Sequence, residues 1–498
     1  MAAMETKKKF TLDVGWAFTA TIIPMAIGFL LRIFFGDYLG ASGLGLYSLA
    51  LIIYTMVTLI GALGIPSATV KYVAEYKEKL DKLDSFITCS IINTLIFGLI
   101  SGLILYLLSG PIALFFHKPE LAILLQILSF GIPFFILINT ITRLFNGLRK
   151  MGFYSISLVI RSSFILIFSV LLIFMDMGVI GAVIAIVIAE ILTTIIVTIL
   201  SLRLFSFKLV EYKKETRTLL TFGVQLILAD GAYFLDTNID TMIVGYFLTS
   251  SSVGIYSIVI MFASLLFIIP GAIAQVTYPL LSELYAKKLK DAMQTTIKKS
   301  TRYAFAVTSV LGLGLILFSS DLITLLLPPV FQQAVIPLSI IVFALMLYVP
   351  FTSIGSTWNA VGKPHITFIL GFTFVAINAA INIGLVPIYG ILGAAIATST
   401  TYIIRPFPEF YLWKKILDIK INRWWYLKPW LILGLLIGLF FYLQTFTNSP
   451  IIKIIILIVW LAFLSLVLLS DDEKKEIIGL SKHLIENKLV MNNKNNEV

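Results

Sequence analysis

The feature that most limits how this chain can fold is a series of apolar runs, each of about 20 residues, that recur along its whole length. About 20 residues of helix cross a hydrocarbon core that is about 30 Å thick. Backbone groups in lipid must be hydrogen-bonded within a helix or a closed barrel, and these runs lack the alternation of barrel strands. The sequence therefore predicts an all-α polytopic membrane protein.

The composition agrees with this interpretation. Hydrophobic residues make up 59% of the chain and charged residues only 13%. A soluble domain is about half apolar and about one quarter charged.

The chain also contains two copies of one pattern. Gly45-Leu46-Tyr47-Ser48 returns as Gly254-Ile255-Tyr256-Ser257, an offset of 209 residues. Later pairs keep nearly the same offset: Gly178 with Gly390 at 212, and Asn146 and Lys150 with Asn359 and Lys363 at 213. Because the offset between matching residues changes so little along the chain, the sequence indicates two copies of one structural unit. Paired halves are how many transporters build a site that can open to either side of the membrane.

Counting the runs predicts six helices in each repeat and two more after them. The first repeat gives Val14–Phe35, Leu46–Ile65, Phe86–Leu108, Leu121–Phe145, Tyr154–Phe174 and Val179–Leu200. The second gives Leu219–Phe247, Val253–Leu281, Tyr303–Phe318, Ala334–Thr357, Ile366–Val386 and Ile391–Leu412, followed by Trp425–Leu443 and Ile451–Leu469. We expect an N-terminal lobe at 1–205, a C-terminal lobe at 206–420, two extra helices at 421–470 and a cytoplasmic tail at 471–498.

Positive charges orient the predicted bundle. With the N-terminus inside, all of the 37 lysines and arginines except four fall on the inner side. Lys118 and Lys453 fall outside, and Arg32 and Arg161 fall within helices. This bias predicts that both termini are cytoplasmic and that the repeats run in parallel orientation, since six helices is an even number. The basic loops face lipid headgroups, so a pI near 9.4 does not indicate a nucleic-acid partner.

Several classes of protein are disfavoured by what the sequence lacks. The single Cys89 excludes an internal disulfide framework and a cysteine-based metal cluster. There is no phosphate-binding loop of the type G-x-x-x-x-G-K-[ST], and the three histidines do not form a triad or a ligand set. We therefore expect no catalytic residues, no cofactor and no resident metal. A secondary transporter or a flippase is the class that remains.

Ionisable residues inside the predicted helices are few and informative. Such groups cost several kcal/mol in lipid and normally face a cavity or a partner. The candidates for a substrate cavity are Arg32, Arg161, Arg405, Glu190, Asp230, Asp236 and Asp240. At about 100° per residue, the three aspartates of the seventh helix fit within one third of its circumference.

Two interpretations of these charges stay open at this point. They could form an ion-pair network that only holds helices together. They could also line a cavity in which arginines hold an anionic head group, while carboxylates serve coupling or gating. Arginine matches phosphate in a bidentate fashion, which favours the second interpretation. Arg143 and Lys150 fit two roles equally well. They could anchor the inner end of a helix, or they could attract substrate to the cavity.

The repeated motifs resemble those of the multidrug/oligosaccharidyl-lipid/polysaccharide (MOP) exporter superfamily. Each half opens its second helix with G-x-Y-S, and Asp240-Thr241-Met242-Ile243-Val244-Gly245 resembles the seventh-helix pattern of the polysaccharide-flippase branch. The segments Asn146–Lys150 and Asn359–Lys363 also resemble that branch, and the likeness covers roughly residues 10 to 415.

The resemblance implies two lobes around a central cavity. It implies alternating access that turns a polyprenyl-linked oligosaccharide from the inner to the outer leaflet of the plasma membrane, in a monomer, with membrane lipids and a coupling ion, H⁺ or Na⁺, as partners. A cation-coupled multidrug antiporter is the second interpretation, because carboxylates of the seventh helix could bind a cation. A lipid II flippase is the third interpretation. It is disfavoured because the first helix offers only Arg32, whereas that branch typically brings several cationic residues together in its cavity. A protein that only scaffolds partners is disfavoured by the intramembrane charges.

Overall fold

The computed structural model describes residues 2–419, 423–444 and 449–464, and the secondary structure in these ranges is helical. The first half contains α1 (Ala2–Tyr38), α2 (Gly40–Gly61), α3 (Ile65–Tyr76), α4 (Leu80–Phe115), α5 (Glu120–Ser129), α6 (Ile132–Gly147), α7 (Met151–Phe174), α8 (Gly178–Ser201) and α9 (Tyr212–Phe247). The second contains α10 (Ser250–Ser264), α11 (Ile268–Ala286), α12 (Lys290–Leu326), α13 (Val335–Thr352), α14 (Thr357–Ala360), α15 (Pro364–Ile404), α16 (Pro406–Leu412), α17 (Arg423–Gln444) and α18 (Pro450–Phe463). Short 3₁₀ turns lie at Leu265–Phe267 and Pro329–Ala334, and a π turn at Trp413–Leu417.

Within the described residues, ten helical segments are long and apolar enough to cross a membrane, and a bent pair makes an eleventh. The protein is therefore a multi-pass helical membrane protein. The bent pair is α5 and α6, which the sequence predicted as one helix and which meet at 48°. Pro133 stands in the first turn of α6, where it has no N–H to donate and its ring crowds the carbonyl four residues earlier, so the helix bends there.

One of the ten spans, Pro364–Leu417, is 54 residues long and contains two predicted helices. Gly390 breaks α15 with φ 60° and ψ −141°. Asn378 and Thr398 would lie about 30 Å apart along a straight helix, yet the Asn378 amide nitrogen lies 3.5 Å from the Thr398 hydroxyl. The chain therefore folds back at Gly390, and the two sides of α15 run antiparallel there.

The last predicted helices are only partly described. Trp425–Leu443 falls within α17, and Ile451–Leu469 is described as far as Leu464. The predicted tail at 471–498 lies outside the described residues.

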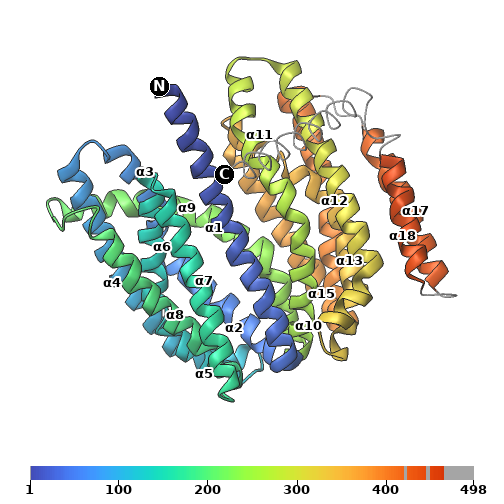
Figure 1. Cartoon of the computed structure of the whole chain (residues 1–498), viewed down its shortest axis with the longest axis horizontal. Coiled ribbons are helices and arrows are strands. Elements are labelled where there is room, and N and C mark those ends of the chain that lie inside the picture. Colours follow the sequence, from blue (N-terminus) through green and yellow to red (C-terminus); the bar gives the residue numbers. More distant parts are fainter. Residues whose placement is uncertain (1, 420–422, 445–448, 465–498) are drawn as a thin grey trace, which may run out of the picture. The chain divides into compact units, whose positions relative to one another are not determined.

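The chain forms two compact units. Unit 1 comprises the described residues within 1–261, 322–337 and 368–398. Unit 2 comprises the described residues within 262–321, 338–367 and 399–498. In unit 1, α7 packs on α8 and on α1, and α4 packs on α5 and α6 (Figure 1). The helix α9 packs on α2, α3 and α4 of the same unit.

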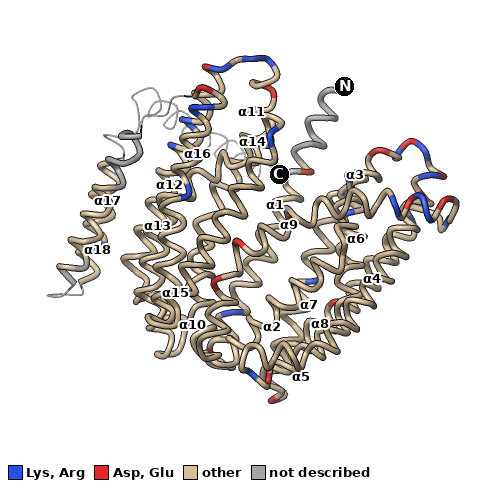
Figure 2. Tube along the Cα trace, turned by 180° about the vertical axis from the view of Figure 1, so that it is seen from behind, with Lys and Arg blue, Asp and Glu red and all other residues tan. Residues whose placement is uncertain are grey.

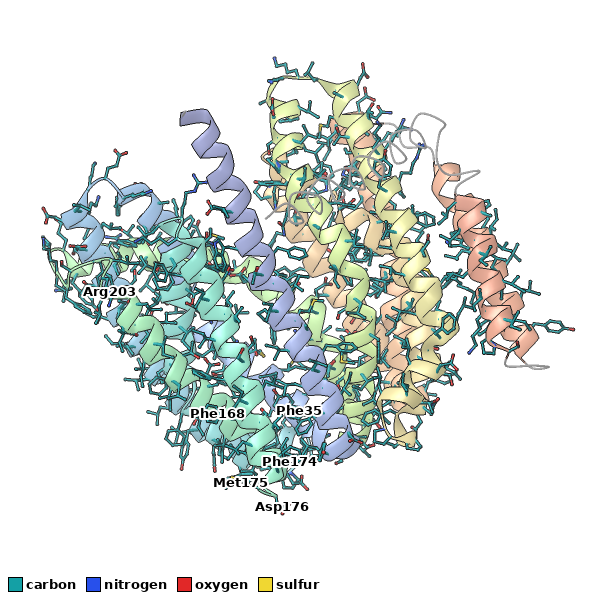
Figure 3. All side chains as sticks on the ribbon, in the orientation of Figure 1. Phe35, Phe168, Phe174, Met175, Asp176 and Arg203 are labelled. Atoms are coloured by element: carbon teal, nitrogen blue, oxygen red, sulfur yellow. The ribbon has the colours of Figure 1, made fainter. Side chains whose placement is uncertain are left out.

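Charged residues lie mainly at helix ends. Figure 2 shows lysines and arginines gathered at the α3–α4 turn of unit 1 and, separately, at the α11–α12 turn of unit 2. Asp176 and Arg203 flank the two ends of α8 and are labelled in Figure 3. In unit 2, the buried Lys453 of α18 pairs with Asp321 of α12 at 2.5 Å, and Trp460 donates a hydrogen bond to Ser309 at 3.0 Å. These contacts fasten α18 to α12.

The two copies of the repeated motif meet each other in unit 1. A Cβ atom added to Gly45 of α2 would lie 1.8 Å from the Ser250 carbonyl oxygen. A Cβ atom added to Gly254 of α10 would lie 1.9 Å from the Ala41 carbonyl oxygen. Ala41 and Ser250 are themselves 209 residues apart, so the contact is reciprocal, as a local two-fold axis between the repeats requires. We call this contact the glycine seam.

Lys118 fastens the same end of unit 1. Its side chain is only 6% exposed, and its ammonium donates to the carbonyls of Phe116 (3.1 Å), Leu248 (2.9 Å) and Gly245. Gly245 and Leu248 lie at the end of α9, where a cation is favourable because the last carbonyls of a helix lack partners. Burial lowers the pKa of Lys118, and the nearby Glu120 opposes that shift.

We expect Lys118→Met to destabilise the protein by about 1–3 kcal/mol, because it leaves buried carbonyls without a donor. Thermal unfolding in detergent, followed by tryptophan fluorescence, measures the effect. Lys208→Met is the control, because Lys208 is exposed and pairs only with the exposed Asp81 at 2.6 Å. An exposed pair contributes about 0–1 kcal/mol. Equal melting temperatures for the two variants would contradict this stabilising role of Lys118.

Candidate functional site

A cavity of about 480 Å³ lies inside unit 1, and we call it the main cavity. Two helix faces supply most of its lining. The face of α2 gives Tyr47, Ser48, Leu51, Ile52, Thr55 and Leu59, and the face of α9 gives Asp230, Tyr233, Phe234, Thr237, Asn238 and Thr241. Steps of three and four residues put each set on one side of its helix. Arg32 of α1, Arg143 of α6, and Ser257 and Ile260 of α10 complete the lining.

The main cavity holds three charged side chains that are not paired with one another. Arg32, Arg143 and Asp230 all line it, and none of them forms an ion pair with any described residue. An unpaired charge at membrane depth is costly. These charges therefore do not serve as internal ties, and they are available to a ligand.

A smaller cavity of about 230 Å³ adjoins the main one. The two share Thr55, Leu59, Arg143 and Asp230. The smaller cavity extends past the end of α2 to Gly64 and along α6 from Arg143 to Phe135. Arg143 and Asp230 therefore stand where the two spaces meet.

A second polar site lies within unit 1 around Asp240. One carboxylate oxygen of Asp240 accepts hydrogen bonds from Thr398 (2.8 Å) and Tyr256 (3.1 Å). Asn378 lies next to Thr398, and Asn382 donates to the Asn378 side-chain oxygen at 3.0 Å. All five side chains are buried. We call this set the Asp240 cluster. It exists because the turn at Gly390 returns Thr398 to the level of Asn378.

The Asp240 cluster has acceptor capacity left over. The second carboxylate oxygen of Asp240 and the side-chain oxygen of Asn382 have no hydrogen-bond donor among the described residues. Leaving such buried acceptors unsatisfied costs about 1–3 kcal/mol each. Carboxylate, amide and hydroxyl oxygens are the ligands of hard cations, and a proton on Asp240 would also supply a donor. The cluster therefore suits a small cation or a proton. In the described part of the chain, no group of three or more His, Cys, Asp or Glu side chains suits a metal ion.

The Asp240 cluster and the main cavity use adjacent residues of α9 and of α10. Asp240 and Tyr256 belong to the cluster, whereas the next residues, Thr241 and Ser257, line the cavity. The two sites are therefore neighbours along both helices.

Arg161 and Glu190 are tied to each other. Arg161 donates to the fully buried Glu190 from its Nε atom at 2.9 Å and from Nη2 at 2.6 Å, and its guanidinium lies 4.8 Å above the Phe135 ring. Neither residue lines the two cavities. Of the two interpretations left open by the sequence, the geometry of this pair fits the structural tie.

The other predicted residues line neither cavity. Arg405 is in unit 2, where its guanidinium lies 5.0 Å from the Tyr348 ring, and that ring stacks on Tyr402. Asp236 is half-buried and lines neither cavity. The structure thus brings Arg32 and Asp230 into one cavity and places Asp240 in a separate cluster.

Sequence reasoning alone did not assign several residues of these sites. For Arg143, the sequence fitted an anchor at the helix end as well as a role in collecting substrate. Its position in the cavity wall depends on the packing of α6. Asn378 and Asn382 carried a usable signal, since two amides four residues apart in an apolar span must share a buried face. Thr398 could not have been assigned, because nothing in the sequence showed which face it shares with Asn378.

Comparison with known proteins agrees with this architecture. The model of the family described as "Polysaccharide biosynthesis protein" matches residues 10–285, more than half of the chain, and the MatE model matches residues 226–383. A membrane protein of Methanocaldococcus jannaschii is 24% identical over 88% of this chain and 89% of its own length. A Haloferax volcanii protein named "Probable flippase AglR" is 30% identical over 32% of this chain and 34% of its own length.

Solved structures share the fold. A lipid II flippase in an inward closed conformation gives a TM-score of 0.71 at 20% identity, over 91% of this chain and 98% of the other. An inward-facing multidrug transporter of the MATE family gives 0.64 at 17% identity, over 81% and 98%. The chain therefore belongs to the family described as "Polysaccharide biosynthesis protein".

Proposed function

We propose that this protein turns a polyprenyl-phosphate-linked oligosaccharide from the inner to the outer leaflet of the plasma membrane, for assembly of a surface glycan. The observation that carries the proposal is the pair of unpaired arginines, Arg32 and Arg143, in the main cavity. Guanidinium groups recognise phosphate through paired hydrogen bonds. The name of the relative "Probable flippase AglR" supports a flippase.

The proposal includes the architecture expected from the sequence. Six helices form an N-terminal lobe at 1–205 and six form a C-terminal lobe at 206–420. Two extra helices bring the total to fourteen, a tail follows them, and both termini lie in the cytoplasm. The monomer works by alternating access while the polyprenyl tail stays among membrane lipids. In this scheme the glycine seam and Lys118 close the outer end, since Lys118 is one of the few cations that the charge bias places outside.

The Asp240 cluster is the proposed site of the coupling ion, Na⁺ or H⁺. Its two unsatisfied oxygens support this assignment. Ion binding there would bias α9 and α10, and with them the wall of the main cavity.

A cation-coupled multidrug antiporter is the second candidate. The MatE match over residues 226–383 and the acidic cluster at Asp240 favour it. Against it stands the cationic lining of the main cavity, because two unpaired arginines repel the cationic dyes that such antiporters export.

We expect Arg32→Ala and Arg143→Ala each to lower flipping of a lipid-linked oligosaccharide about ten-fold to a hundred-fold. A lost hydrogen bond to a charged group is worth about 1.5–3 kcal/mol. Purified protein in liposomes, with a fluorescent polyprenyl-phosphate oligosaccharide and an outside lectin to score exposed sugar, gives the rate.

Arg149→Ala is the matched control. It is 65% exposed, it pairs only loosely with Asp13 at 3.7 Å, and it lies six residues beyond Arg143. Its rate should equal that of the unaltered protein. If liposomes instead export cationic dyes under a sodium gradient and leave lipid-linked sugars in place, the antiporter is the correct assignment.

A further inference from the structure

The main cavity is chemically divided between helices. Its cations come from α1 and α6, as Arg32 and Arg143. The face of α9 contributes no cation, and instead it carries a carboxylate, a phenol, hydroxyls and an amide. A ligand that fits both kinds of surface must carry an anionic part and a hydroxyl-bearing part.

Two side chains on the α9 face are open to a ligand. Tyr233 is 72% exposed although it lies in the middle of an apolar span. Asp230, one turn earlier on the same face, is exposed and has no ion-pair partner among the described residues. By contrast, the neighbouring Thr237 and Asn238 already donate to backbone carbonyls of α9 at 3.0 and 2.9 Å.

We propose that Asp230 and Tyr233 form a sugar subsite. This subsite binds the sugar attached directly to the lipid phosphate and selects a neutral sugar over an acidic one. This inference rests on the proposed function. It assigns phosphate recognition to the arginines and sugar recognition to α9.

The chemistry of the two side chains gives the selection. A carboxylate accepts hydrogen bonds from two adjacent sugar hydroxyls, and these bonds are the stronger kind because the acceptor is charged. An aromatic ring packs its face against the C–H groups of a sugar ring, whose partial positive charge suits the negative face of the ring. A uronic acid would place a second carboxylate beside Asp230, and like charges in one site repel.

The position of Asp230 defines where the sugar lies. Like Arg143, it stands at the junction with the smaller cavity, whereas Arg32 lines the main cavity alone. A phosphate held at Arg32 therefore leaves its first sugar directed along α9 toward the junction. Further sugars would extend into the smaller cavity, which Asn139 lines.

The test uses the full-length protein in liposomes with three probes: a polyprenyl phosphate hexose, a polyprenyl phosphate hexuronic acid and a sugar-free polyprenyl phosphate. We expect the hexose probe to be flipped at least ten-fold faster than the hexuronic acid probe. Asp230→Asn should bring that ratio close to one, because the amide no longer repels a carboxylate. The control, Asp176→Asn, changes a carboxylate at the α7–α8 turn (Figure 3) and should leave the ratio unchanged.

Tyr233→Leu should slow both sugar probes about ten-fold and leave the sugar-free probe unaffected, whereas Tyr233→Phe, which keeps the ring, should recover most of the loss. Equal rates for hexose and hexuronic acid with the unaltered protein would overturn the sugar subsite while the proposed function stands. Failure to flip any of the three probes would overturn the proposed function itself.

Discussion

Adding one methyl group at Gly45 is expected to abolish transport while the protein still inserts into the membrane. The new Cβ atom would lie 1.8 Å from the Ser250 carbonyl oxygen, where ordinary contact needs 3.4–4 Å. No rotamer relieves the clash, because both partners are fixed by the backbone. α2 and α10 must therefore separate, and the glycine seam cannot close. We expect Gly254→Ala to have the same effect through the Ala41 carbonyl.

Flipping in liposomes measures the loss, which should exceed ten-fold for each variant. Disulfide formation between Ala41→Cys and Ser250→Cys, with Cys89 replaced by alanine, reports whether the seam closes. Gly28→Ala on α1 is the matched control, because a Cβ atom there meets no other atom within 4 Å. Unchanged transport by Gly45→Ala would exclude the seam from the transport cycle.

The sequence predicted the helical class and the duplicated halves because both depend on local patterns. Apolar runs determine helices in lipid. The offset of 209 residues relates Gly45 to Gly254, yet it could not show that the two glycines touch, since contact between the copies depends on how they pack. The bend between α5 and α6 also lies inside a segment that was predicted as one helix, although Pro133 interrupts the backbone hydrogen bonds there.

Intramembrane charges were identified from the sequence, but their partners were not. The three aspartates of α9 looked like one stripe, and the structure separates them: Asp230 lines the main cavity and Asp240 enters a cluster with α10 and α15. Small angular differences around a helix decide which neighbour each residue meets. Arg161 looked like a cavity arginine and is tied to Glu190, 29 residues away.

Asp240→Asn is expected to remove the dependence of transport on a cation gradient and to slow flipping at least ten-fold. Asparagine keeps a side-chain oxygen that can accept from Thr398 and Tyr256, so the local fold should persist. It loses the charge that attracts a cation, and it has no site for a titrating proton. Flipping rates with a sodium gradient at constant pH, and with a pH gradient without sodium, measure the effect separately for each ion.

Ligand-dependent stability gives the decisive comparison, because an ion that binds only the folded protein raises its stability by about 2.7 kcal/mol at one hundred times the dissociation constant. We expect sodium chloride, compared with choline chloride, to raise the melting temperature of the unaltered protein and of Asp37→Asn, whose carboxylate is exposed near the end of α1. The Asp240→Asn variant should show no such rise. An equal rise in all three proteins would place the sodium site elsewhere. A rise produced only by lower pH, again absent in Asp240→Asn, would identify the coupling ion as a proton, since the buried carboxylate of Asp240 would then supply the donor that its unsatisfied oxygen lacks.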